Sequence, residues 1–327
     1  MERWRKVKIK YFSIPLFLNF PISPYCFSLC LRASVVNFYN FLYKDKNKTM
    51  KFGRLEIHSV SDGFFRLDGG AMFGIVPRVL WEKNNPPDDK NRILLGLNTL
   101  LIITKEKRII VDTGIGDKGD EKFRSMFGVE RNPTLIESLA RLNISVNDID
   151  IVINTHLHWD HAGGNTKRGN DGSIIPTFPK ARYILQKGEW EDALFPNDRT
   201  RGSYHQEDFL PVKESGQLEL IDGDLTIEEG IDIVKIPGHI RHFQTVIISS
   251  EGKKGIFFGD LIPTVSHLPN PYIMGYDLFP LETLEAKKRI IKRGVEERWL
   301  LIFEHDPKFR MGYARMEKGK PVFEPIP

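Results

Sequence analysis

Short apolar runs separated by polar turns dominate the chain from residue 54 onward. Runs of this kind, rich in isoleucine and valine, are typical of buried β-strands. Strand ends at one edge of a sheet bring distant residues together in α/β folds. Five runs end just before a histidine or an aspartate: residues 108–111, 149–153, 231–236, 256–258 and 300–303. The pattern therefore predicts a sheet-based fold with one functional site assembled from strand ends.

Apolar residues at helical spacing occur in three segments, residues 133–142, 189–194 and 282–297. Pro133 suits the first turn of its helix, and Ser145 can cap a short helix that follows. Together with the strands, these segments predict two mixed β halves with helices outside them.

Polar turns divide the region before residue 112 into hairpins. Residues 61–63, Ser-Asp-Gly, predict a turn between two strands, and residues 105–107, Lys-Glu-Lys, predict a second turn. Between them, residues 68–81 are glycine-rich and apolar, which predicts a long loop. Long apolar loops often carry function, so this loop either covers a binding site or packs over the core.

The segment with the most chemistry is residues 155–164, Thr-His-Leu-His-Trp-Asp-His-Ala-Gly-Gly. His156 and His158 are two residues apart, so in an extended chain they point the same way and can bind one metal ion. Asp160 and His161 follow where the chain turns and can face a second ion. Four such side chains this close together favour a metal site over solvated surface histidines. The glycine pair that follows lets the backbone pass close under the site.

The motif His-x-His-x-Asp-His, followed by a separate His, Asp and His, resembles the metallo-β-lactamase superfamily. His239, Asp260 and His305 match the three followers, and Asp112 matches the superfamily's early aspartate. The resemblance implies an α/β (α+β) fold, the four-layer αββα sandwich. It places that fold in one domain, residues 50–327.

The resemblance also implies a dinuclear centre with two divalent metal ions, Zn²⁺ first and Fe²⁺ or Mn²⁺ as alternatives. The implied ligands of the first ion are His156, His158 and His239, and those of the second are Asp160, His161 and His305. Asp260 would bridge the ions, and Asp112 would orient ligands from behind. Hydroxide formed from a water whose pKa the ions lower toward about 7 would attack the substrate. Asp160 would move the proton to the leaving group.

The aspartate at position 260 indicates which branches of the superfamily the chain resembles. Members that cleave β-lactams typically carry a cysteine or serine at this position. An aspartate instead resembles the lactonase, glyoxalase II, phosphotriesterase and tRNA-processing branches. The quorum-quenching lactonase-like branch is most similar, through residues 68–77 and 259–264.

That branch implies hydrolysis of a lactone or ester, with N-acyl homoserine lactone as a candidate substrate. The apolar segments 71–81 and 263–279 would cover its acyl group. The candidate substrate-lining residues are Met72, Phe73, Ile75 and Tyr276.

Two positions depart from the branch. Many relatives have Gly-His-x-x-Gly-His around the third histidine, whereas here His242 stands one residue early. We therefore expect His239 to keep the ligand position. Well-studied acyl-homoserine lactonases carry a substrate-contacting tyrosine where this chain has Pro263. Tyr276 is the candidate to replace that tyrosine.

Other functions stay open from the sequence. A phosphodiesterase or phosphotriesterase would use the same residues, and so would a thioester hydrolase similar to glyoxalase II. A di-iron redox or sensor protein is a non-enzymatic alternative, but such proteins usually carry a flavin or rubredoxin-like domain, and neither is evident.

Charge and cysteine content narrow the partners. The net charge is +4, but residues 1–49 carry +7, so the rest carries −3. A mildly acidic body argues against nucleic acid as the main partner. The resemblance implies a small ester or lactone as the partner instead. Both cysteines, Cys26 and Cys30, lie before residue 50, so the metal site must be built from histidine and aspartate. A homodimer is compatible with this composition.

The first 49 residues allow three interpretations. Residues 11–31 carry no charge and could span a bilayer or act as a signal peptide, although three prolines interrupt them. The segment could instead be a tail, or translation could begin at Met50. The abrupt change of composition at Met50 favours the last interpretation, and with it a cytoplasmic protein. A real N-terminal segment would favour an anchored or exported protein.

Overall fold

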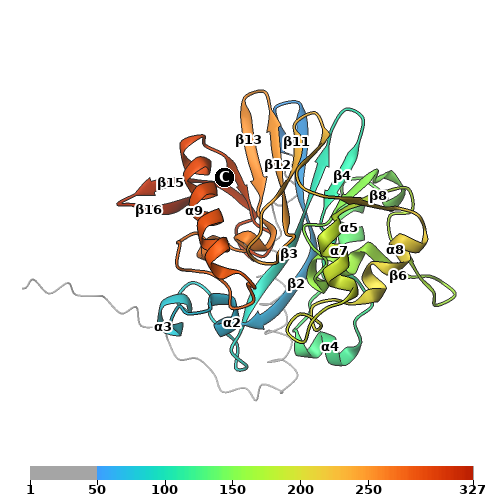
Figure 1. The fold of residues 1–327 in the computed structure, drawn as a ribbon, viewed down its shortest axis with the longest axis horizontal. Coiled ribbons are helices and arrows are strands. Elements are labelled where there is room, and N and C mark those ends of the chain that lie inside the picture. Colours follow the sequence, from blue (N-terminus) through green and yellow to red (C-terminus); the bar gives the residue numbers. More distant parts are fainter. Residues whose placement is uncertain (1–49, 327) are drawn as a thin grey trace, which may run out of the picture. The chain divides into compact units, whose positions relative to one another are not determined.

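The computed structural model describes residues 50–326, and two seven-stranded β-sheets with helices outside them organise this part of the chain (Figure 1). In spatial order, the first sheet contains β1 (Met50–Phe52), β2 (Leu55–Asp68), β3 (Arg92–Ile103), β4 (Arg108–Val111), β5 (Ile151–Ile153), β8 (Arg182–Gln186) and β9 (Leu218–Ile221). The second contains β10 (Leu225–Glu228), β11 (Ile231–Lys235), β12 (Gln244–Ser250), β13 (Lys253–Phe257), β14 (Leu300–Ile302), β15 (Met311–Glu317) and β16 (Lys320–Pro325).

The helices connect these strands or follow their ends. They are α2 (Gly69–Phe73), α3 (Arg78–Trp81), α4 (Glu121–Met126), α5 (Leu135–Ala140), α6 (Trp159–Ala162), α7 (Lys187–Leu194), α8 (Leu210–Glu214) and α9 (Pro280–Glu296). Five short 3₁₀ helices are η1 (Val146–Asp148), η2 (Gly163–Asn165), η3 (Gln206–Asp208), η4 (Gly259–Leu261) and η5 (Val265–His267). Strands β6 (Thr166–Arg168) and β7 (Ile174–Pro176) pair separately.

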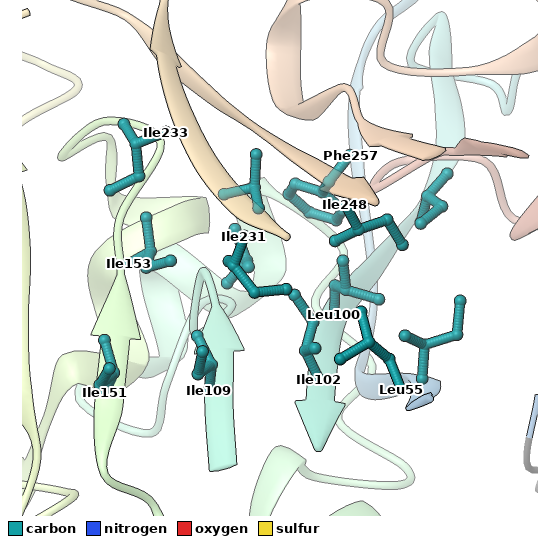
Figure 2. Packing of buried hydrophobic residues seen from close by; sticks show 14 of the residues in the cluster. Leu55, Leu100, Ile102, Ile109, Ile151, Ile153, Ile231, Ile233, Ile248 and Phe257 are labelled. Atoms are coloured by element: carbon teal, nitrogen blue, oxygen red, sulfur yellow. The ribbon is translucent and has the colours of Figure 1, made fainter. Parts of the chain in front are cut away.

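The two sheets pack face to face through aliphatic side chains (Figure 2). Leu100, Ile102 and Ile109 from the first sheet share this core with Ile231 and Ile248 from the second. Non-directional burial of these side chains is the main force that holds the sheets together.

Helices cover the outer face of each sheet. Leu135 and Leu139 on α5 pack with Val152 of the first sheet. Ile290 on α9 packs with Leu301 of the second sheet. Both sheets are thus buried on both faces, and the predicted four-layer αββα sandwich is confirmed.

Parallel pairing places the functional strand ends side by side. Strands β4 and β5 are parallel, with Val111 opposite Ile153, so residues 112 and 154–156 leave the sheet together. Strands β13 and β14 are also parallel, with Phe257 opposite Ile302. Such strands are buried on both faces and therefore read as continuous apolar runs. This is why the sequence pattern located them.

The turn predicted at residues 61–63 is wrong. Strand β2 continues through this segment, and its register with β3 shifts between Ser61 and Phe64 as a bulge. Asp62 in the bulge is fully buried, and its carboxylate accepts the backbone N–H groups of Ile115, Gly116 and Leu135. A β-bulge changes the direction in which a side chain points. Here Asp62 points inward and holds neighbouring backbone groups, so the polar residues at 61–63 do not mark a turn.

The predicted loop at residues 68–81 also needs correction, because much of it is helical. Asp68 caps α2 by accepting a hydrogen bond from the Ala71 N–H at 2.8 Å, and α3 follows after a short link. The three predicted helices correspond to α5, α7 and α9, and Ser145 caps η1 as expected. However, α5 begins at Leu135 with Thr134 as its N-cap, so Pro133 precedes the helix, and α4, α6 and α8 were not predicted.

No helix within residues 50–326 combines the length and the apolar character needed to cross a bilayer. The alternatives for residues 1–49 concern a segment outside the described residues.

Leu100 tests the packing between the sheets. It is fully buried, whereas Leu281 is 77% exposed. Leu100→Ala should lower the free energy of unfolding by about 2–5 kcal/mol because it leaves a cavity. Leu281→Ala is the control and should change it by less than about 0.5 kcal/mol. Denaturant titration measures both values, and equal losses in the two variants would contradict this description of the core.

Candidate metal centre

Strand ends of both sheets deliver the histidines and aspartates to one place. His156 and His158 follow β5, and α6 then carries Asp160 and His161. His239 follows β11, Asp260 lies in η4 directly after β13, and His305 follows β14. All seven residues predicted from the sequence therefore converge, although they are spread over half the chain.

These side chains form two groups. In each group, one ligand atom per residue lies within 4.8 Å of the others. The first group is His156, His158, His239 and Asp260, and the second is Asp160, His161 and His305. Ring nitrogens face each other within both groups. His239 Nε2 lies 3.2 Å from His158 Nδ1, and His305 Nε2 lies 3.1 Å from His161 Nε2.

Asp260 lies between the two groups. Its Oδ2 is 3.2 Å from His239 Nε2, in the first group. Its Oδ1 is 3.1 Å from His305 Nε2 and 3.5 Å from His161 Nε2, in the second group. One carboxylate oxygen is therefore directed to each group, as a carboxylate shared by two cations requires.

Two buried polar atoms support a cation in this space. His156 Nε2 and Asp260 Oδ1 are inaccessible to solvent and have no hydrogen-bond partner among the described residues. Leaving such atoms unsatisfied costs about 1–3 kcal/mol each. Imidazole nitrogens and carboxylate oxygens are ligands of divalent transition metals, so the donor set fits two such ions.

Buried aspartates contact the Nδ1 atoms of two of these histidines and orient the rings. Asp112 accepts hydrogen bonds from Thr155 N–H at 2.7 Å and Thr155 Oγ1 at 2.6 Å, and its Oδ2 lies 3.1 Å from His161 Nδ1. Asp277 Oδ1 lies 2.9 Å from His239 Nδ1. Partners of this kind fix the orientation of a ligand ring and leave its other nitrogen free.

Burial and neighbouring charges lower the pKa of some of these histidines and raise the pKa of others. Burial, followed by the neighbouring imidazoles, holds the pKa values of His156 and His158 well below their usual range. Burial also lowers the pKa of His161, but the carboxylates of Glu304, Asp260 and Asp160 together raise it well above the usual range. Burial raises the pKa of the Asp260 carboxyl, but the surrounding histidines outweigh burial and hold it well below its usual range.

The glycine pair after the motif has the predicted role. A Cβ on Gly163 would collide with the Ile115 carbonyl oxygen, and one on Gly164 with the Thr113 carbonyl oxygen. Only glycine lets these two backbone segments approach so closely. His242, in contrast, lies beside Gly188 and belongs to neither group of ligands.

A cavity of about 500 Å³ opens onto the centre. Its apolar lining includes Leu67, Met72, Phe127, Met274 and Leu278, and its polar lining includes Arg199, Thr200 and Ser203. Gly275, beside this cavity, is hydrogen-bonded to two other segments of the chain. Its N–H donates to the Ala71 carbonyl at 2.7 Å, and its carbonyl accepts from Arg199 Nη2 at 2.8 Å.

Of the four residues predicted to line the substrate site, two line the cavity and two do not. Met72 and Tyr276 line the cavity. Phe73 does not line it, because its ring is stacked in the interior between Trp81 and His267. Ile75 points into solvent and is 91% exposed.

Sequence reasoning missed several residues of this region. Arg199 lies in a polar segment without a recognisable motif. Trp159 stands inside the metal motif, but its position in the cavity lining could not be predicted from its type or spacing. Glu304 was visible beside His305, and its fully buried position shows only in the folded chain.

The chain belongs to the metallo-β-lactamase superfamily, whose family model matches residues 94–305. The earlier resemblance is thereby confirmed. Members of this superfamily similar to the chain are hydrolases, and several are named as lactonases.

Three relatives illustrate the similarity. An N-acyl homoserine lactonase from Bacillus cereus is 26% identical over 234 residues, which is 68% of this chain and 83% of the relative. The structure of a probable metal-dependent hydrolase from Staphylococcus aureus is 30% identical, with a TM-score of 0.79 over 85% of this chain and 99% of that one. AidC, a dizinc quorum-quenching lactonase, shares the fold at 23% identity, with a TM-score of 0.70 over 86% of this chain and 97% of that one.

Lys287 ties the segment beside the cavity to α9 and gives a testable pH dependence. Its Nζ donates to the carbonyls of Pro269 and Tyr272, and burial lowers its pKa to about 7. An unfolded lysine titrates near about 10.4. Between these values the unfolded chain binds more protons, so stability should rise with pH.

We therefore expect the wild type to gain stability relative to Lys287→Met from about pH 7 to pH 10, with no such gain below pH 7. Urea unfolding of both proteins at a series of pH values measures this difference. A difference that stays constant with pH would contradict the assignment.

Proposed function

We propose that this chain is a dinuclear metal-dependent hydrolase that opens a lactone or cleaves a related ester. The single observation that carries the proposal is the position of Asp260, whose two oxygens are directed to two separate groups of histidines. The similarity to proteins named as N-acyl homoserine lactonases supports a lactone as the substrate class.

The proposed ligands follow the two groups. His156, His158 and His239 would hold one ion, Asp160, His161 and His305 the other, and Asp260 both. When bound, the two ions would lower the pKa of a shared water and polarise the substrate carbonyl. Zinc is the ion we propose first, with iron and manganese as alternatives.

Asp160 is proposed as the residue that moves the proton. Its carboxylate lines the cavity, and its Oδ2 lies 3.8 Å from the Nε2 atoms of both His161 and His305. An oxygen at the boundary between ligands and cavity can accept a proton from the attacking water and pass it to the leaving group.

The cavity lining supports an amphiphilic small molecule as the substrate. Met72, Met274 and Leu278 offer an apolar surface for an acyl group. Tyr276 is 38% exposed and lines the same cavity, so its hydroxyl is available to a bound substrate. We propose that it takes the role of the tyrosine that Pro263 replaces.

Removal of metal tests the centre. Chelation should abolish hydrolysis, and added Zn²⁺ should restore it. His158→Ala and Asp260→Ala should each lose bound metal, because each removes a proposed ligand. Elemental analysis of the purified full chain measures this loss. Full activity in metal-free protein would rule out the proposal.

A substrate panel tests the reaction class. Acyl-homoserine lactones of several chain lengths should be hydrolysed faster than an aryl ester, a thioester or a phosphotriester, as followed by proton release. Tyr276→Phe should lower kcat/KM for lactones by about tenfold, the effect of about 1.4 kcal/mol from one lost hydrogen bond. Two bound metals with turnover of the phosphotriester or thioester alone would keep the dinuclear centre and reject the lactone.

A further inference from the structure

Glu304 is a buried carboxylate next to the proposed centre. It follows β14 and precedes His305, and none of its surface is exposed. Its Oε2 lies 2.9 Å from His161 Nδ1. Neither of its oxygens has a hydrogen-bond partner within residues 50–326, although Oε2 faces this ring nitrogen.

A second carboxylate lies at the same ring nitrogen. Asp112 Oδ2 is 3.1 Å from His161 Nδ1. Asp112 has another task, because both of its oxygens accept hydrogen bonds from Thr155. Glu304 accepts no hydrogen bond from the described residues. The His161 ring is the group that its carboxylate faces.

An isolated buried carboxylate is expensive and persists only where positive charge compensates it. Five carboxylates are buried around these histidines, those of Asp112, Asp160, Asp260, Asp277 and Glu304. Two divalent cations would compensate most of this negative charge. Glu304 therefore adds to the charge that favours a loaded centre and would be a liability in a protein that bound no metal.

We propose that Glu304 is a positioning residue that strengthens metal binding by the group of Asp160, His161 and His305. Its negative charge beside Nδ1 of His161 favours the proton on that nitrogen, which is hydrogen-bonded to Asp112, and thereby keeps Nε2 of that ring free for the ion. Consistent with this, His161 Nε2 points toward Asp260 Oδ1 at 3.5 Å and His305 Nε2 at 3.1 Å. The inference rests on the dinuclear centre proposed above.

Glu304→Gln tests the role of the charge. Glutamine keeps the shape and one oxygen that can face His161 Nδ1, but it removes the negative charge. Loss of such a partner typically weakens metal binding by about 10–100-fold. We expect that loss for one of the two Zn²⁺ ions, with the other unchanged, in competition titrations against a chromophoric chelator.

Glu189→Gln is the matched control. Glu189 is also fully buried beneath the motif, but its oxygens accept hydrogen bonds from Leu157 N–H and Tyr204 Oη rather than from an imidazole. Burial raises its pKa to about 8, so it is largely protonated at pH 7, and the amide is a close replacement. Both Zn²⁺ affinities should stay at their wild-type values.

A spectroscopic readout separates a ligand effect from a general structural one. Co²⁺-loaded Glu304→Gln should show an altered visible absorption spectrum for one ion, and Glu189→Gln should show the wild-type spectrum. Two ions bound to Glu304→Gln with wild-type affinity and spectrum would overturn the inference and leave the proposed function intact. Fewer than two ions bound to the wild type would instead overturn the proposed function.

Glu304→Asp keeps the test valid if the glutamine variant does not fold. Aspartate retains the charge but withdraws it by one methylene from His161. This variant should lower the affinity for one Zn²⁺ ion and leave the affinity for the other unchanged. Equal affinity for both ions in wild type and Glu304→Asp would again overturn the inference.

Discussion

The burial of many ionisable groups in one small volume is the constraint on which the rest of this structure depends. Five histidines and five carboxylates lie together near the strand ends, nearly all of them shielded from water. Ions are costly to bury unless opposite charges and hydrogen bonds compensate them. The hydrogen bonds to Asp112 and Asp277 satisfy the outer side of this cluster. Its inner side retains unpartnered atoms, where cations fit.

The sandwich makes this concentration of charge tolerable. The apolar contact between the two sheets supplies stability that does not depend on the site. Parallel pairs β4–β5 and β13–β14 then bring the ends of strands from distant parts of the chain into register. The ligands therefore lie in short segments and helical turns that follow the strand ends and are anchored by the sheets. Sites held by regular elements are more precise than sites built only on loops.

Sequence reasoning succeeded where chemistry and periodicity coincide. The ligand-bearing strands were predictable because parallel strands buried on both faces leave apolar runs, and His156 to His161 form a dense motif. It failed at Asp62, whose Ser-Asp-Gly context favours a turn but here forms a buried bulge. It failed also at Ile75, since an apolar loop residue gives no sign of which way it points. Glu304 was overlooked because its meaning depends on His161, which is 143 residues away in the sequence.

The central claim is that two metal ions share Asp260, and crystallography of the Zn²⁺-loaded full chain tests it most directly. Anomalous difference maps on both sides of the zinc absorption edge would locate each ion. We expect two peaks, one within bonding distance of His156 Nε2 and Asp260 Oδ2, the other within bonding distance of His305 Nε2 and Asp260 Oδ1. A single peak, or two peaks that do not share Asp260, would contradict it.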